Sequence, residues 1–256
     1  MNKHNNYSVL TIVFLFFLCS CVSKKELLYL QDIQTLNNSE VISSQNILQE
    51  NDILKIDITS LEMNASIPYN KSSTKENFGS TLQLLQLNGY LVSKDKTIKF
   101  PVLGEITVAG KTTEDLEQYL KELLEFEGHL INPNVSVRVL NSKVTILGEV
   151  NRPGTYTFIE KNISLLQALG LAGDLTIEGN RKNIIVIREF NGQRITSNLD
   201  LTSASWLISP YQNIQPNDVI IVNPNSKKIT SAGLIGNIST VLSIASVVLS
   251  SIILLK

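Results

Sequence analysis

The feature that most constrains this chain is its uncharged C-terminal end. Residues 229–255 are 27 consecutive positions without a charged side chain. An uncharged apolar stretch of more than about 18 residues is a candidate transmembrane helix. The stretch is rich in Val and Ile, but a lone strand cannot satisfy its backbone hydrogen bonds in lipid. We therefore predict a C-terminal membrane helix over residues 229–255.

Serines recur along one side of this predicted helix. At 100° per residue they fall within an arc of roughly 60°, and they are Ser239, Ser243, Ser246 and Ser250. Such a stripe suits two helices that pack closely in a membrane. It also suits a ring of helices whose polar side faces a water-filled lumen. Both interpretations imply association of several chains, so the four serines are candidate pore-lining or helix-packing residues.

The N-terminus has the parts of a bacterial signal peptide. A positive start at Lys3 precedes the uncharged apolar run 9–18, which is too short to span a bilayer. Ser20 directly before Cys21, with Leu18 three positions before that cysteine, resembles a lipobox. We predict that residues 1–20 are removed and that Cys21 carries the acyl chains, palmitate among them. The alternative is an ordinary secretory signal with incidental cysteines. No acidic residue follows Cys21 directly, which favours the outer membrane.

Composition excludes several function classes. The chain has 22 Lys and Arg against 23 Asp and Glu, a net charge of −1, which lacks the basic excess of a nucleic-acid binder. After processing, Cys21 and His129 would be the remaining cysteine and histidine, so no disulfide is predicted. His129 stands at a predicted helix end, where it is read as a cap. The sequence contains no G-x-S-x-G and no phosphate-binding loop. We predict no enzyme activity, no cofactor and no metal.

Strand and helix patterns alternate between the two ends. Residues 51–58 alternate apolar and polar side chains, as a half-buried strand does. Helices are predicted from Thr112 to near Gly128, and over 163–171, where Ser164 and Gln167 form a possible capping box. Two short sequence motifs recur: residues 103–110 resemble residues 147–154, and residues 50–54 resemble residues 216–220. The alternative to an internal repeat is that such short motifs are similar by chance.

These patterns predict an α+β fold. It consists of two small β-rich domains over 45–140 and 141–224, after a lipidated tether over 21–44 and before the C-terminal transmembrane helix.

The order of several motifs resembles a known family. Residues 89–104, GYLVSKDKTIKFPVLG, are similar to the signature of the polysaccharide export (Wza-type) domain, and VAGKT at 108–112 is similar to the helix start that follows it. NPNVSV at 132–137 resembles the next strand of that domain, and 144–156 resembles the opening of an SLBB β-grasp domain. Lys96 departs from the usual glycine, and one SLBB copy is evident. The compact length and the lysines after Cys21 look most like the versions in Bacteroidota.

The resemblance implies an outer-membrane lipoprotein with its body in the periplasm. Copies would assemble into a ring of about eight, whose terminal helices let capsular polysaccharide or exopolysaccharide leave the cell. The implied partners are other copies, the polysaccharide, outer-membrane lipid and an inner-membrane polysaccharide co-polymerase or tyrosine kinase. The alternative is a periplasm-facing adaptor or glycan-binding module of a polysaccharide assembly complex, without a pore. Trp206 is read as local core or a subunit contact.

Overall fold

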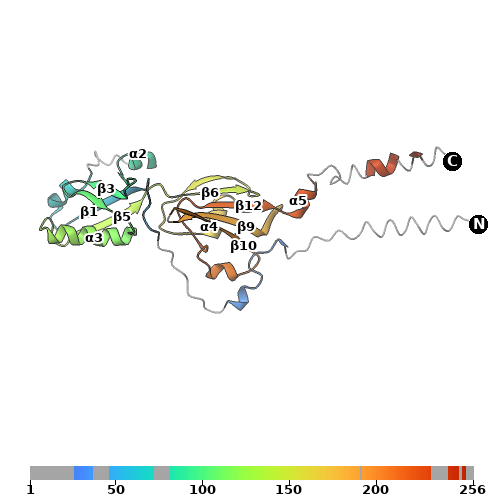
Figure 1. The fold of residues 1–256 in the computed structure, drawn as a ribbon, viewed down its shortest axis with the longest axis horizontal. Coiled ribbons are helices and arrows are strands. Elements are labelled where there is room, and N and C mark those ends of the chain that lie inside the picture. The colour runs from blue at the N-terminus through green and yellow to red at the C-terminus, as the bar shows by residue number, and fades with distance from the viewer. Residues whose placement is uncertain are drawn as a thin grey trace, which may run out of the picture.

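The computed structural model of the protein describes residues 26–36, 46–71, 81–190, 192–231, 242–247 and 250–251. Most of these residues form two packed bodies that lie end to end (Figure 1). We call residues 46–140 the first body. The second body comprises residues 142–231 together with the N-terminal segment 26–36.

A three-stranded antiparallel sheet forms the centre of the first body. Its order is β2 (Tyr90–Leu91), β1 (Ile53–Thr59) and β5 (Asn134–Val139). The apolar and polar alternation predicted over residues 51–58 is confirmed in β1, since Leu54, Ile56 and Ile58 are buried. Helix α3 (Thr113–Phe126) covers one face of the sheet with its buried leucines, Leu116, Leu120 and Leu124.

Shorter elements complete this body. Strands β3 (Thr97–Phe100) and β4 (Gly104–Thr107) form a hairpin, and η3 (Met63–Tyr69) and α2 (Leu82–Leu87) lie in the connection between β1 and β2. Lys96, at the position where the resemblance expects glycine, has a positive φ of 55°, a left-handed conformation that favours glycine. All buried apolar residues of this core come from one continuous stretch, 48–137.

The second body is built on a five-stranded sheet in the order β10-β9-β12-β6-β7. The strands are β6 (Lys143–Gly148), β7 (Gly154–Thr157), β9 (Gly179–Phe190), β10 (Gln193–Leu199) and β12 (Val219–Pro224). Strands β6 and β12 pair in parallel, whereas the other neighbours are antiparallel. Strands β9 and β10 form an antiparallel hairpin.

Helix α4 (Leu165–Leu171) packs into the second core through Leu165, Ala168 and Leu169. The predicted Ser164–Gln167 capping box is confirmed. The short pair β8 (Ile163–Ser164) and β11 (Asn213–Ile214) and the turn η4 (Ser205–Ile208) close this side. Trp206 on η4 is buried in the core, the first of the two roles considered for it.

The N-terminal segment packs on the second body, although it precedes the first body in sequence. The Leu30 and Gln31 backbone N–H groups donate to the carbonyls of Leu201 and Thr202 at 3.0 and 2.8 Å. The Tyr29 hydroxyl donates to Asp174, 145 residues away. The turn η2 (Ile33–Thr35) follows. Residues 29–32 of the predicted tether are therefore part of the second body's structure.

The prediction of an α+β fold that ends in a transmembrane helix is wrong. Across the described ranges, the chain holds no helix with the length and apolar character to cross a membrane. The predicted span begins inside α5 (Ser226–Ser231), a six-residue helix that is about 9 Å long and includes Lys227 and Lys228. A run of residues without charge does not fix where a helix starts and ends. The described fold is mixed α/β, with four sheets.

Candidate functional site

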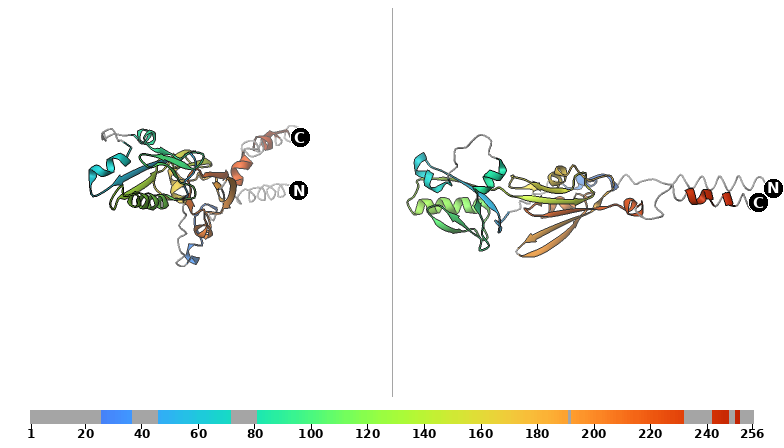
Figure 2. Two further views of the ribbon diagram at one scale, coloured as in Figure 1. Left: turned by 60° about the vertical axis from the view of Figure 1, so that its left-hand side comes forward. Right: turned by 90° about the horizontal axis from the view of Figure 1, so that it is seen from above.

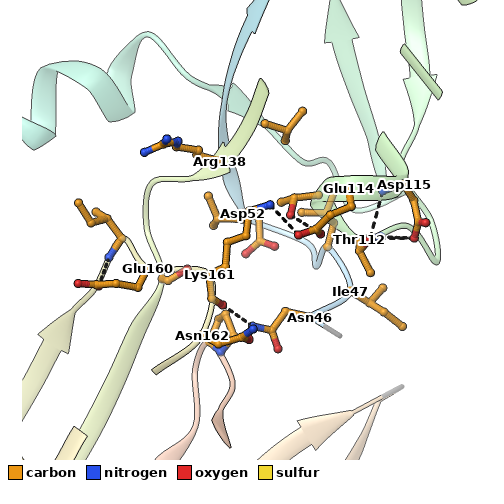
Figure 3. Close-up of a pocket in the computed structure, with 17 residues that line it drawn as sticks. Asn46, Ile47, Asp52, Thr112, Glu114, Asp115, Arg138, Glu160, Lys161 and Asn162 are labelled. Carbon is orange, nitrogen blue, oxygen red and sulfur yellow. Dashed lines mark hydrogen bonds and ion pairs between the residues drawn. The ribbon is translucent and has the colours of Figure 1, made fainter. Parts of the chain in front are cut away.

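The two bodies meet around a polar pocket (Figure 3). Its volume is about 510 Å³, within the range of small-ligand sites. Its walls come from the segment before β1, the start of α3, the C-terminal half of β5 and the connection between β7 and β8. We call it the junction pocket. Its lining includes Asn46, Asp52, Glu114, Arg138, Glu160 and Lys161.

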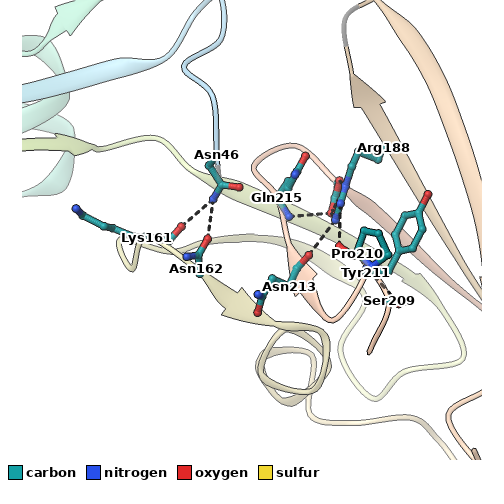
Figure 4. A network of polar contacts seen from close by, with 10 residues as sticks. Asn46, Lys161, Asn162, Arg188, Ser209, Pro210, Tyr211, Asn213 and Gln215 are labelled. Atoms are coloured by element: carbon teal, nitrogen blue, oxygen red, sulfur yellow. Dashed lines mark hydrogen bonds and ion pairs between the residues drawn. The ribbon is translucent and has the colours of Figure 1, made fainter. Parts of the chain in front are cut away.

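Residues 46–48 cross the junction and contact both bodies. The Asn46 amide Nδ2 donates to the Lys161 carbonyl at 2.8 Å and to Asn162 Oδ1 at 3.0 Å (Figure 4). On the other side, the Leu48 N–H donates to the Lys111 carbonyl at 2.9 Å. The amide oxygen Oδ1 of Asn46 is buried and accepts no hydrogen bond from the described part of the chain.

An ion pair also connects the bodies. Lys161 Nζ lies 2.6 Å from Glu114 Oε1, and both side chains are more than half exposed. The hydrogen bond from Lys161 lowers the pKa of Glu114 to about 2. Because water screens such an exposed pair, it contributes less than about 1 kcal/mol. The ion pair therefore adds little to the stability of the contact between the two bodies.

The start of α3 is fixed by a capping box. The Thr112 side chain accepts from the Asp115 N–H at 3.1 Å, and Asp115 Oδ2 accepts from the Thr112 N–H at 2.9 Å. This confirms the helix start predicted from the sequence. The far end closes with Gly128 at a positive φ of 72° and with the His129 N–H donating to the Leu124 carbonyl. His129 therefore takes part in the cap through its backbone.

Two turns of the same geometry precede β1 and β12. In each, a glutamine N–H donates to an aspartate carboxylate three residues on, at 2.8 Å for Gln49 to Asp52 and 2.9 Å for Gln215 to Asp218. The asparagines before the two aspartates have φ values of 68° and 69°. The similarity of 50–54 and 216–220 in the sequence thus corresponds to one turn used twice.

The two carboxylates nevertheless have different surroundings. Asp218 is paired with Arg188, whose Nη2 lies 2.7 Å from Oδ2, and the guanidinium also donates to the Pro210 and Asn213 carbonyls (Figure 4). Asp52 is only 7% exposed and lines the junction pocket. In the described structure it accepts one hydrogen bond, from Gln49, and has no cation at ion-pair distance. Burial raises the pKa of the Asp52 carboxyl to about 6.

A second polar cluster lies at the end of the second body, around α5. Lys228 Nζ lies 2.9 Å from Glu149 Oε1 and 2.7 Å from Glu178 Oε2. The Thr176 hydroxyl donates to the same Glu149 carboxylate at 3.1 Å. These contacts hold α5 on the second body.

The predicted site residues do not meet at the junction pocket. Cys21 and Ser239 lie outside the described residues. Ser243, Ser246 and Ser250 are exposed, and the hydroxyls of Ser246 and Ser250 donate to backbone carbonyls four residues earlier. Their role in pore lining or helix packing stays a prediction. No cluster of three or more His, Cys, Asp or Glu side chains that could hold a metal occurs within the described ranges.

Sequence reasoning did not select Asn46 or Asp52 as site residues. The sequence did point to Asp52 in one way, because Asp52 and Asp218 occupy the same position in the recurring motif of residues 50–54 and 216–220. The two aspartates differ because Asp218 is paired with Arg188, which lies 30 residues away from it in sequence. Comparing the two short motifs alone does not reveal so distant a partner. Asn46 carries no sequence signal, because its partner Lys161 is 115 residues distant.

Two family models match the chain in sequence. A model described as polysaccharide biosynthesis/export protein matches residues 41–140, and a model of the SLBB domain matches residues 143–197. Both matches fall on regions that the structure shows as separately packed cores.

Known proteins with similar sequences carry names that describe polysaccharide export. The EPS I polysaccharide export outer membrane protein EpsA of Ralstonia nicotianae is 34% identical over 107 residues, which cover 40% of this chain and 27% of that protein. The capsule polysaccharide export protein BexD of Haemophilus influenzae is 26% identical over 195 residues, which cover 73% of this chain and 45% of that protein.

The aligned part is thus less than half of each relative's length. These genera do not test the similarity to Bacteroidota, which stays a prediction. The order of the two matched domains is nevertheless the order that the sequence motifs indicated. The chain therefore contains a polysaccharide biosynthesis/export domain over residues 41–140, followed by an SLBB domain over residues 143–197.

Proposed function

We propose that this chain is a subunit of an outer-membrane assembly that exports capsular polysaccharide or exopolysaccharide. The observation that carries the proposal is the succession of an export domain and an SLBB domain on two packed cores. The names of the relatives, which describe export of EPS I and of capsule, support the same class of substrate. In this proposal the export domain extends over 45–140 and the SLBB domain over 141–224.

Acylated Cys21 is the membrane anchor in this proposal. Glu26 and Leu27, the first described residues, line a pocket together with residues 177–180, 182 and 225–228 at the α5 end of the second body. Cys21 is five residues before Glu26, so the two Cα atoms are at most about 18 Å apart. The second body then lies next to the bilayer, and the first body, at the opposite end of the molecule, is farthest from it (Figure 2).

The assembly is a ring of copies of this chain, and it receives polymer from an inner-membrane polysaccharide co-polymerase or tyrosine kinase. The family resemblance supports both the ring of copies and the inner-membrane partner. The orientation given by the anchor agrees with it, because the first body then faces the periplasm, where such a partner would reach it. The chain conducts the polymer and does not cleave or form its bonds.

The test is the distribution of polysaccharide in cells that lack this gene. We expect surface polysaccharide to fall and periplasmic polysaccharide to rise, and we expect the full chain to restore both. Surface polysaccharide that stays unchanged in the deletion strain would contradict the export function.

The anchor is tested by complementing the same strain with Cys21→Ala. This variant is expected in the soluble fraction, without restoring export, since the acyl chains supply stable membrane binding. Cys19→Ala is the matched control, because it changes a neighbouring cysteine that processing removes. If Cys21→Ala remained in the membrane and restored export as the control does, the lipid anchor would be wrong.

A further inference from the structure

The junction pocket contains a buried carboxylate that has no cationic partner. Its equivalent in the second body, Asp218, has the same turn and the same glutamine contact, but Arg188 compensates its charge. For Asp52 the described structure supplies only the Gln49 N–H. A buried carboxylate without a cation is unfavourable, and a bound cation removes the penalty.

The pocket offers a second acceptor without a donor. The Asn46 amide oxygen is buried and unpaired, while the Nδ2 group of the same side chain is occupied by Lys161 and Asn162. Asn46 and Asp52 line the same pocket (Figure 3). A ligand that fits this arrangement supplies several N–H or O–H donors.

The other charges of the pocket are already occupied or lie at its rim. Glu114 is paired with Lys161, and Asp115 is held by the capping box of α3. Glu160 and Arg138 are exposed. Asp52 is therefore the buried charge to which an incoming cation would bind.

The size of the pocket favours a ring-sized ligand over a single side chain. Its volume of about 510 Å³ lies in the range of small-molecule sites, and one lysine or arginine side chain would leave most of it unfilled. We propose that the junction pocket binds a positively charged amino sugar, whose ammonium group pairs with Asp52 and whose further donors reach Asn46. The saccharide class of this ligand rests on the proposed function in polysaccharide export.

The experiment measures binding of a glucosamine tetramer to the full chain by isothermal titration calorimetry at pH 7. The N-acetylglucosamine tetramer, which lacks the positive charge, is the matched ligand. Asp52→Asn removes the charge but keeps an acceptor for the Gln49 N–H, and thermal unfolding checks its fold. Glu160→Gln is the matched variant, because it neutralises an exposed carboxylate of the same pocket.

We expect the glucosamine tetramer to bind at least about tenfold more tightly than the acetylated one, and Asp52→Asn to lose about tenfold in affinity, as for a charge-assisted hydrogen bond. Glu160→Gln is expected to stay within about twofold. Equal binding of the two tetramers, or equal affinities of the two variants, would overturn the proposal. If Asp52→Asn instead reduced self-association in light scattering and left sugar binding unchanged, the cation would belong to a second copy and the proposal would also be wrong.

Export in cells separates this proposal from the function on which it rests. A deletion strain that loses surface polysaccharide, together with no Asp52-dependent sugar binding, would overturn the site and leave the export function intact. Normal export in the deletion strain, together with Asp52-dependent binding, would overturn the export function and support the site.

Discussion

At the scale of single residues, the two equivalent aspartates differ in whether a cation compensates the buried charge: Asp218 has Arg188, and Asp52 has no such partner in the described structure. The Asp52 carboxyl has its pKa raised by burial from 3.8 to about 6. Between about pH 4 and pH 6 the folded state therefore holds a proton that the unfolded chain has lost. The free energy of unfolding falls as pH rises through this window, by up to about 3 kcal/mol, and stays low above it.

Asp52→Asn removes this loss, because the amide carries no charge to bury. We expect its free energy of unfolding to exceed that of the parent chain by up to about 3 kcal/mol at pH 7, with little difference near pH 4. Urea unfolding at the two pH values measures this. A variant less stable than the parent at pH 7 would contradict the description of Asp52 as a charge without a partner.

Asp218→Asn is expected to act in the opposite direction. It leaves the Arg188 guanidinium buried without its carboxylate, which costs about 3–5 kcal/mol. The same urea titration at pH 7 tests it. Similar effects of the two substitutions would mean that the two turns do not differ in the way that the structure shows.

At the scale of elements, α3 depends on its first turn. Thr112→Ala removes the side-chain acceptor of the capping box, and we expect a loss of about 1–2 kcal/mol in the free energy of unfolding. Thr113→Ala is the control, since its hydroxyl bonds only the neighbouring Glu114, and its effect should stay below about 0.5 kcal/mol. Chemical denaturation compares the two, and equal losses would contradict the role of the cap.

Elements with local causes were predictable from the sequence. The start of α3 follows from Thr112 and Asp115, its end from Gly128, and the burial pattern of β1 from its alternation. The export and SLBB assignment was predictable because several motifs occur in a fixed order. What the sequence pattern did not reveal depends on distant partners: the packing of Tyr29 against Asp174, and the contact of Asn46 with Lys161. The prediction of a membrane helix was wrong for another reason. The lack of charged side chains in a segment does not determine how long a helix that segment forms.

At the scale of the whole molecule, the two bodies are built differently. The first body takes its core from one continuous stretch, whereas the second adds Tyr29 and Leu30 from a segment on the other side of the first body in sequence. The second body is therefore complete only when residues from both sides of the first body have come together.

Deleting residues 26–36 is expected to lower the stability of the second body alone. The loss of two backbone hydrogen bonds and of the packing of Tyr29 and Leu30 corresponds to about 2–3 kcal/mol. Hydrogen exchange reports the two bodies separately, so faster exchange in β9 and β12 with unchanged exchange in β1 and α3 is the expected result. Tyr29→Phe, which removes the bond to Asp174, should give a smaller effect in the same direction. Equal acceleration in both bodies would contradict this division.

The position of the N-terminal segment also decides how the molecule carries mechanical load. A pull on the chain before Glu26 is resisted where Tyr29 is bonded to Asp174 and where Leu30 and Gln31 are bonded to Leu201 and Thr202. A pull on the chain after α5 is resisted by Lys228, which is held by Glu149 and Glu178. Both forces therefore end in the second body, and the first body bears no tension from either end while those contacts last.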